Sequence, residues 1–225
     1  MTDGTRYVQA LGLELDPAWR RQADPERAAD WDAFAQTLAA DERLTTHTYS
    51  TIGLRPGLDL LLWRLAPSFD VLESSAAALL CSGLGRWLRV SLSFLGIVVP
   101  SQYVRRPTEQ EQSLFSGARS RYLVVYPFTK DTSWYLLGKE ARQGVMNEHM
   151  RIGHSYPQVR QLLANSFGLD DMDFLVAYET DDLPAFSQLV RDLRGSDSRR
   201  STVRDTPLVA AVHRAPDELR GLLGT

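Results

Sequence analysis

The order of strand-like and helix-like segments in the first hundred residues limits what this chain can fold into. Segments that alternate between apolar and polar residues predict strands, and segments with apolar residues three and four apart predict helices. In chain order, strand, helix, strand, strand, helix and strand patterns occupy residues 6–15, 24–40, 44–52, 58–65, 69–84 and 88–99. This is the element order of the split βαβ, or ferredoxin-like, motif.

The second half of the chain repeats this pattern in part. A polar stretch at 100–118 predicts a connection. After it, strand, extended, helix, helix, strand, helix and strand patterns occupy residues 119–128, 134–137, 139–152, 156–165, 173–180, 183–193 and 206–213. We therefore expect an α+β protein with two ferredoxin-like halves, at 1–99 and 119–225, which form a subunit of the dimeric α+β barrel type.

Composition narrows the function classes. The chain has 225 residues, of which 44% are hydrophobic and 24% charged, as in ordinary globular proteins. The formal net charge of −3 argues against nucleic acid as a partner, because phosphate binding usually needs a basic excess. The sequence has no apolar run of about eighteen uncharged residues, so we expect no membrane span. The single cysteine, Cys81, cannot form an internal disulfide, which favours a cytoplasmic location.

Common catalytic signatures are absent from the sequence: it has no GxxxxGK[ST], GxGxxG, GxSxG, HExxH or CxxC pattern. The acid pairs Asp170–Asp171 and Asp181–Asp182 stand at element boundaries, where acids usually cap helices. His149 lies in an apolar helical stripe, and from spacing alone such a histidine is more often a core residue than a ligand. His154 is five residues further on, the wrong spacing for two ligands on one helix face.

One side of the strand at 119–128 has two interpretations. The strand period of two places four of its side chains together, namely Tyr122, Val124, Tyr126 and Phe128. Lys130 joins them if the strand continues past the proline at 127. Such a face is either core with a snorkelling lysine at its rim or one wall of a pocket for a flat anionic ligand. Taken alone, the pattern favours core.

Ordered motifs add a resemblance to this pattern. They read YPFTK at 126–130, WYLL at 134–137, HMRIGHSY at 149–156, SFGLDD at 166–171, ETDD at 179–182, and a stretch from 193 to 207, with LGRWL at 84–88 and PSQY at 100–103 as less specific matches. Together they resemble the chlorite dismutase and coproheme decarboxylase superfamily. The resemblance implies a homopentamer of two-part ferredoxin-like subunits, each of which binds one heme in its C-terminal half.

The resemblance also implies which residues hold the heme. The histidine that opens the family motif H-x-x-x-G-x-x-Y is the proximal iron ligand, and here it is His149. Asp197 is the nearest match to the acid that makes this ligand more electron-donating through its other ring nitrogen. Phe128, where the family usually has methionine, and Trp134 are expected to line the cofactor.

The resemblance further implies catalytic residues. In coproheme decarboxylases the motif Y-P-x-x-K supplies a reactive tyrosine and a lysine that anchors a propionate, here Tyr126 and Lys130. The distal arginine of chlorite dismutases falls on Gln161 if one residue is missing before it, and on the next leucine if not. Arg160 is adjacent and stays a candidate. A serine common in decarboxylases is Arg199 here.

The implied function is a peroxide-dependent coproheme decarboxylase, which converts iron-coproporphyrin III to protoheme. Its cofactor is heme, as iron-coproporphyrin III or heme b, and its partners are the porphyrin substrate and hydrogen peroxide. A chlorite dismutase or heme peroxidase is the first alternative, and it needs a polar distal group that retains an oxyanion near iron. A heme-binding protein without turnover is the second, since fold alone does not decide function.

Overall fold

The computed structural model describes residues 6–99 and 118–224. It divides into two compact units, one made of residues 1–98 with 211–225 and the other of residues 99–210. The last fifteen residues thus join the first unit, whereas the sequence pattern had grouped them with 119–225. The predicted connection at 100–118 lies outside the described residues except for its last position. No helix in the described ranges is long and apolar enough to cross a membrane.

The first unit has the predicted ferredoxin-like order. Its main elements are β1 (Arg6–Leu15), α1 (Asp24–Ala40), β2 (Thr45–Ser50), β3 (Leu60–Ala66), α2 (Phe69–Cys81) and β4 (Leu88–Val98). The strands pair antiparallel in the order β4-β1-β3-β2. Short 3-10 helices at Pro17–Arg21 and Gly83–Trp87, and the helix α7 (Pro216–Leu223), were not predicted.

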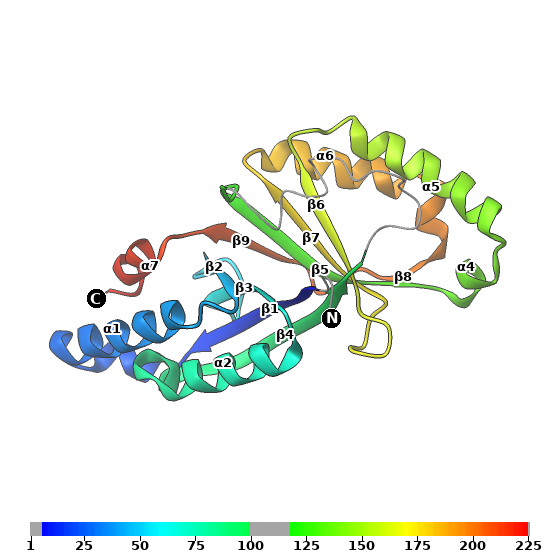
Figure 1. Cartoon of the computed structure of the whole chain (residues 1–225). Coiled ribbons are helices and arrows are strands. Elements are labelled where there is room, and N and C mark those ends of the chain that lie inside the picture. The colour runs from blue at the N-terminus through cyan, green and yellow to red at the C-terminus, as the bar shows by residue number, and fades with distance from the viewer. Residues whose placement is uncertain (1–5, 100–117, 225) are drawn as a thin grey trace. The chain divides into compact units, whose positions relative to one another are not determined.

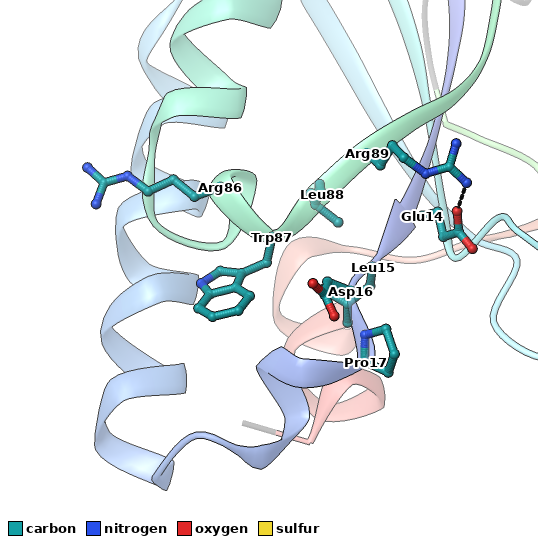
Figure 2. A pocket seen from close by; sticks show the side chains of 8 residues that line it. All are labelled: Glu14, Leu15, Asp16, Pro17, Arg86, Trp87, Leu88 and Arg89. Carbon is teal, nitrogen blue, oxygen red and sulfur yellow. Dashed lines mark hydrogen bonds and ion pairs between the residues drawn. The ribbon is translucent and has the colours of Figure 1, made fainter.

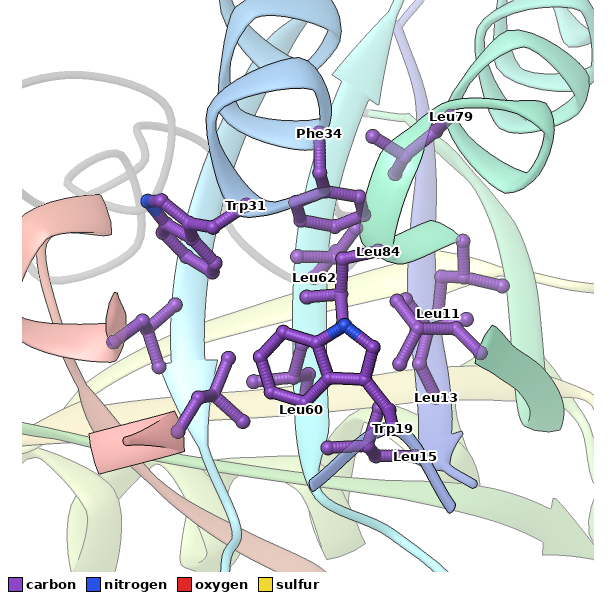
Figure 3. Packing of buried hydrophobic residues seen from close by; sticks show 13 residues of the cluster. Leu11, Leu13, Leu15, Trp19, Trp31, Phe34, Leu60, Leu62, Leu79 and Leu84 are labelled. Atoms are coloured by element: carbon purple, nitrogen blue, oxygen red, sulfur yellow. The ribbon is translucent and has the colours of Figure 1, made fainter. Parts of the chain in front are cut away.

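The core of the first unit lies between its sheet and its helices (Figure 3). Trp31 and Phe34 of α1 and Leu79 of α2 meet leucines of β1 and β3 there. Trp19, from the first 3-10 helix, is fully buried in this cluster, and its indole N–H donates to Asp30 at 2.9 Å. An indole buried this way contributes its large apolar area to folding without leaving a donor unpaired.

The second unit repeats the ferredoxin-like order. Its elements are β5 (Tyr122–Lys130), α4 (Thr132–Leu136), α5 (Lys139–His154), β6 (Arg160–Asn165), β7 (Phe174–Thr180), α6 (Leu183–Arg194), a 3-10 helix at Asp197–Ser201 and β8 (Thr202–Arg204). The strand β9 (Val209–His213) begins in this unit, and its last three residues belong to the first. Within the second unit the strands pair antiparallel in the order β6-β7-β5-β8. Helices α5 and α6 both cover the same side of this sheet (Figure 1). The predicted α+β class with two ferredoxin-like halves is confirmed.

Two local predictions in this unit were wrong. Residues 134–137 were expected to be extended, but α4 forms because the Asp131 carboxylate caps it by accepting from the Trp134 N–H at 2.9 Å. Residues 156–165 were expected to be helical, but β6 occupies most of them. Its Leu-Leu-Ala run has helical preference, which the pairing of all of β6 with β7 overrides. The expected capping role of the acid pairs is confirmed at Asp182, which caps α6.

Candidate functional site

The register of β5 and β7 defines the face that carries the predicted residues. Val124 lies opposite Tyr178, Tyr126 opposite Val176, and Phe128 opposite Phe174. Because directly opposed residues of an antiparallel pair point to the same side, these six side chains share one face. Five of them join one apolar cluster with side chains of α5 and α6. The strand does continue through Lys130, with an irregularity in its pairing to β8 at that residue.

The same register separates the two candidate distal residues. Gln161 of β6 lies opposite Tyr178, and Arg160 lies opposite Glu179. Gln161 is therefore on the face covered by the helices, and Arg160 is on the other. There the Arg160 guanidinium lies 2.9 Å from the Glu179 carboxylate, whose side chain is fully buried. Of the two candidates, only the glutamine faces α5 and α6.

A pocket on the helix-covered face brings His149 and Gln161 together. It is lined by His149, Met150, Gly153 and His154 of α5, Gln161 of β6, and Leu189 and Leu193 of α6. Leu189 and Leu193 also belong to the apolar cluster that contains Tyr126 and Phe128. Tyr126, Phe128, His149 and Gln161, which are up to 35 residues apart in sequence, thus line one apolar site that helices α5 and α6 cover.

His149 is held through one ring nitrogen. Its Nδ1 lies 3.1 Å from the Ser198 hydroxyl oxygen, and that oxygen lies 2.9 Å from the hydroxyl of Ser196. Ser196 in turn donates to the Leu193 carbonyl at 2.7 Å. Among the described residues Nε2 has no hydrogen-bond partner. One ring nitrogen is therefore anchored to the protein while the other stays available to a ligand.

The environment of His149 keeps its ring neutral. Burial lowers its pKa from 6.5 to about 4, and the Lys130 ammonium adds to this effect, while Glu148 opposes it. Burial lowers the pKa of a histidine because the cation loses hydration that the neutral ring does not need. Neutral imidazole is the form that coordinates a metal.

Lys130 is buried beside this histidine. Its ammonium donates to the Ser198 carbonyl oxygen at 2.5 Å, and lies 4.6 Å from the ring centroid of Trp134 and 5.2 Å from that of Phe128. Burial lowers its pKa from 10.5 to about 8. Within the described ranges it makes no ion pair with a carboxylate. The Lys130 ammonium therefore contacts two other predicted residues, Phe128 and Trp134. It also contacts Ser198, whose hydroxyl lies beside the His149 ring.

Asp197 does not contact the His149 ring, contrary to expectation. Its side chain is 66% exposed and pairs with Arg200 at 3.3 Å, while its backbone N–H donates to Glu148. The next residue, Ser198, occupies the position beside Nδ1. A neutral hydroxyl thus replaces the predicted carboxylate, because the 3-10 helix turns Ser198 inward and Asp197 outward.

Tyr126 is paired with a second tyrosine. Its ring stacks on that of Tyr178, with centroids 6.2 Å apart and planes at 23°. Burial, with a further contribution from the Tyr178 hydroxyl, raises the Tyr126 pKa well above 10. A phenol in this environment keeps its proton at every physiological pH.

The donor set suits one kind of metal group. No cluster of three or more histidine, cysteine or acidic side chains that could hold a bare ion occurs in the part of the chain that the structure describes. A single neutral imidazole in an apolar pocket is too few ligands for such an ion. It is sufficient for an iron that already has four porphyrin nitrogens, since haem needs only one axial ligand from the protein.

A second pocket lies in the first unit, between the end of β1 and the start of β4 (Figure 2). Its charged groups are already engaged: Glu14 pairs with Arg89, and the Asp16 carboxylate accepts the Ala18 N–H. Arg86 donates to the Cys81 carbonyl. None of the predicted site residues lines this pocket.

Comparison with known proteins identifies the family. The family model of chlorite dismutase matches residues 26–214. The chain belongs to the chlorite dismutase family. Coproheme decarboxylase from Mycolicibacterium smegmatis is 31% identical over 170 residues, which cover 71% of this chain and 68% of that protein.

Solved structures of the chlorite dismutase family agree with this assignment. A mutant chlorite dismutase from Candidatus Nitrospira defluvii superposes with a TM-score of 0.89 and 26% identity, over 98% of this chain and 96% of that one. The enzyme from the same organism in complex with imidazole gives a TM-score of 0.87 at 26% identity, over 99% and 96% of the two chains. The resemblance of the sequence motifs is confirmed. Because these relatives carry two different enzyme names, family membership alone leaves the reaction open.

Within the chlorite dismutase family site, two residues were missed by sequence reasoning. Tyr178 follows the period of two in β7, and its pairing with Tyr126 required the strand register. Ser198 is one position from the residue that was chosen, and no local pattern separates the two. The sequence could place each of them in a strand or segment, but it could not show that Tyr178 contacts Tyr126 or that Ser198 contacts His149.

Proposed function

We propose that this protein is a peroxide-dependent coproheme decarboxylase. The observation that carries the proposal is the neutral His149, with one free ring nitrogen, in a pocket shared with Gln161. Leu189 and Leu193 of the same pocket belong to the apolar cluster that contains Tyr126. His149 would hold the iron of ferric coproheme, which supplies the oxidising equivalents of hydrogen peroxide when bound. By resemblance we also propose a homopentamer.

Tyr126 would carry out the hydrogen-atom steps. Its phenol gives up one electron and one proton, and the phenoxyl then takes a hydrogen atom from a substrate propionate. Loss of a second electron from the propionate breaks its carbon–carboxylate bond, and the products are a vinyl group and carbon dioxide. Each propionate thus loses two electrons and one proton with its carboxylate, and one peroxide is reduced to two waters. Holding the propionate against the phenol is a matter of positioning.

Lys130 would receive the anionic end of the substrate. Its ammonium is buried without a carboxylate partner among the described residues, and this raises the energy of the charged form. An arriving propionate compensates that charge, so the site favours a porphyrin with carboxylate arms. An ammonium has three N–H donors, so Lys130 can bind a propionate and keep its bond to the Ser198 carbonyl.

The distal side favours this reaction over chlorite dismutation. A cationic donor holds an oxyanion beside the iron more strongly than a neutral amide does. Gln161, which faces the pocket, is neutral, and Arg160 is on the opposite face in an ion pair with buried Glu179. A heme peroxidase remains the second candidate, because the pocket and His149 alone serve that activity.

The test is to load the protein with ferric coproheme, titrate hydrogen peroxide, and follow porphyrin mass. Stepwise loss of two carboxyl groups in the wild type and none in Tyr126→Phe is the expected result. A bound porphyrin whose mass never changes would move the assignment to a peroxidase. Oxygen release from chlorite by the wild type would instead favour chlorite dismutase.

A further inference from the structure

We infer that Ser198 and Ser196 are positioning residues, which form a directed hydrogen-bond relay that fixes the tautomer of His149. In this tautomer the neutral ring has its proton on Nδ1, and Nε2 can donate its lone pair to a metal. The inference rests on the proposed binding of heme iron by His149. It adds that this chain uses a hydroxyl where the family resemblance led us to expect a carboxylate. As a consequence, His149 would donate less electron density to the iron than it would with a carboxylate beside Nδ1.

The direction of the relay follows from counting protons. The Leu193 carbonyl can only accept, so the Ser196 hydroxyl must donate its single proton there. The Ser196 oxygen is then free only to accept, so the Ser198 hydroxyl donates to it across 2.9 Å. The Ser198 oxygen must therefore accept from His149, which places the ring proton on Nδ1. All three hydrogen bonds form only in this arrangement.

The same proton count shows which ring nitrogen of His149 is available to a metal. With the proton on Nδ1 and a neutral ring, Nε2 carries a lone pair. That is the form in which an imidazole coordinates a metal, so the relay prepares the ligand before the metal arrives. A rotamer change of either serine would leave a buried donor or acceptor unpaired, because Ser196 and Ser198 are only 4% and 6% exposed.

The segment that carries the relay is itself held in place. Lys130 donates to the Ser198 carbonyl from within its buried site, and also lies 3.4 Å from the Thr202 hydroxyl. On the other side the Asp197 N–H donates to Glu148, the residue before His149. The Ser198 hydroxyl is thus fixed from the sheet and from α5, as precise control of a ligand requires.

The chemical difference between a hydroxyl and a carboxylate is one of charge. A carboxylate partner pulls the Nδ1 proton toward itself, gives the ring imidazolate character, and stabilises ferric iron. A serine that passes its own proton onward is a weaker acceptor without a charge. We therefore expect the coproheme complex of this protein to have a higher midpoint potential and a weaker iron–histidine bond than its Ser198→Asp variant.

The first experiment uses the full chain without porphyrin. Nitrogen-15 NMR of His149 at pH 7 is expected to show a protonated Nδ1 and an unprotonated Nε2. In Ser198→Ala the ring should move toward a mixture of tautomers, and Ser198→Thr, which keeps the hydroxyl, should restore the wild-type signals. A protonated Nε2 in the wild type, or an unchanged tautomer in Ser198→Ala, would overturn the relay.

The second experiment uses the coproheme complex and measures the midpoint potential and the ferrous iron–nitrogen stretching frequency. Ser198→Asp should lower the potential and raise the frequency, because Lys130 is near enough to keep the new acid charged. Ser155→Asp is the matched control, since it adds the same charge at an exposed site on the end of α5. Equal shifts in the two variants would refute the inference.

Failure of the proposed function has a different signature. If His149→Ala keeps the wild-type spectrum of the coproheme complex, then His149 is not the ligand and the heme proposal fails. The NMR result on the relay would stand in that case, because it needs no porphyrin. If His149→Ala loses the spectrum while Ser198→Asp behaves as the Ser155→Asp control does, the heme proposal survives and the relay does not control the ligand.

Discussion

Acid destabilisation of the porphyrin-free protein should depend strongly on His149. The pKa of this group is about 4 in the folded protein and 6.5 in the unfolded chain. The unfolded state therefore binds more protons between these values, and stability rises with pH across that window. The full effect, reached below pH 4, is about 3 kcal/mol. Between pH 7 and pH 5 the loss is about 2 kcal/mol.

Urea unfolding at pH 7 and pH 5, followed by tryptophan fluorescence, measures this loss. His149→Gln removes the titration and keeps a group that can form a hydrogen bond with Ser198. Its stability should therefore fall by about 2 kcal/mol less than that of the wild type over the same interval. His154→Gln, an exposed position on the same helix, is the control and should behave as the wild type does. If His149→Gln and the wild type lose equal stability, the His149 ring is not buried in its neutral form.

Three further outcomes follow from the structure. Glu179→Gln should lower the free energy of unfolding in urea by about 3 kcal/mol, because it leaves the guanidiniums of Arg119 and Arg160 without their buried counter-ion. Gln161→Leu should change the peroxide-driven rate measured by mass spectrometry, whereas Arg160→Gln should change stability but leave the coproheme spectrum intact. Trp19→Ala should cost about 3–5 kcal/mol in urea unfolding, since it empties a fully buried site.

The element order of both halves was predictable because it depends on local patterns. The strand at Arg6–Leu15 and the helix at Asp24–Ala40 were predicted with the bounds that the structure has, from apolar periodicity and a proline near the helix start. Segments without such a pattern were not predictable. β6 has helix-favouring residues and becomes a strand because every one of its residues pairs with β7. The helix α7 contributes to the first core through Leu219 and Leu223, which the sequence alone could not assign to a partner.

Part of the candidate site could also be predicted from the sequence, and part could not. Its residue types were readable from ordered motifs, so His149, Tyr126 and Lys130 could be chosen before any contact was known. The choice between Gln161 and Arg160 could not be made, since it depends on which side of β6 faces the helices. The choice between Asp197 and Ser198 depends on how one 3-10 helix turns against α5. A shift of one residue reverses the direction of a side chain in a strand, and only long-range pairing determines that register.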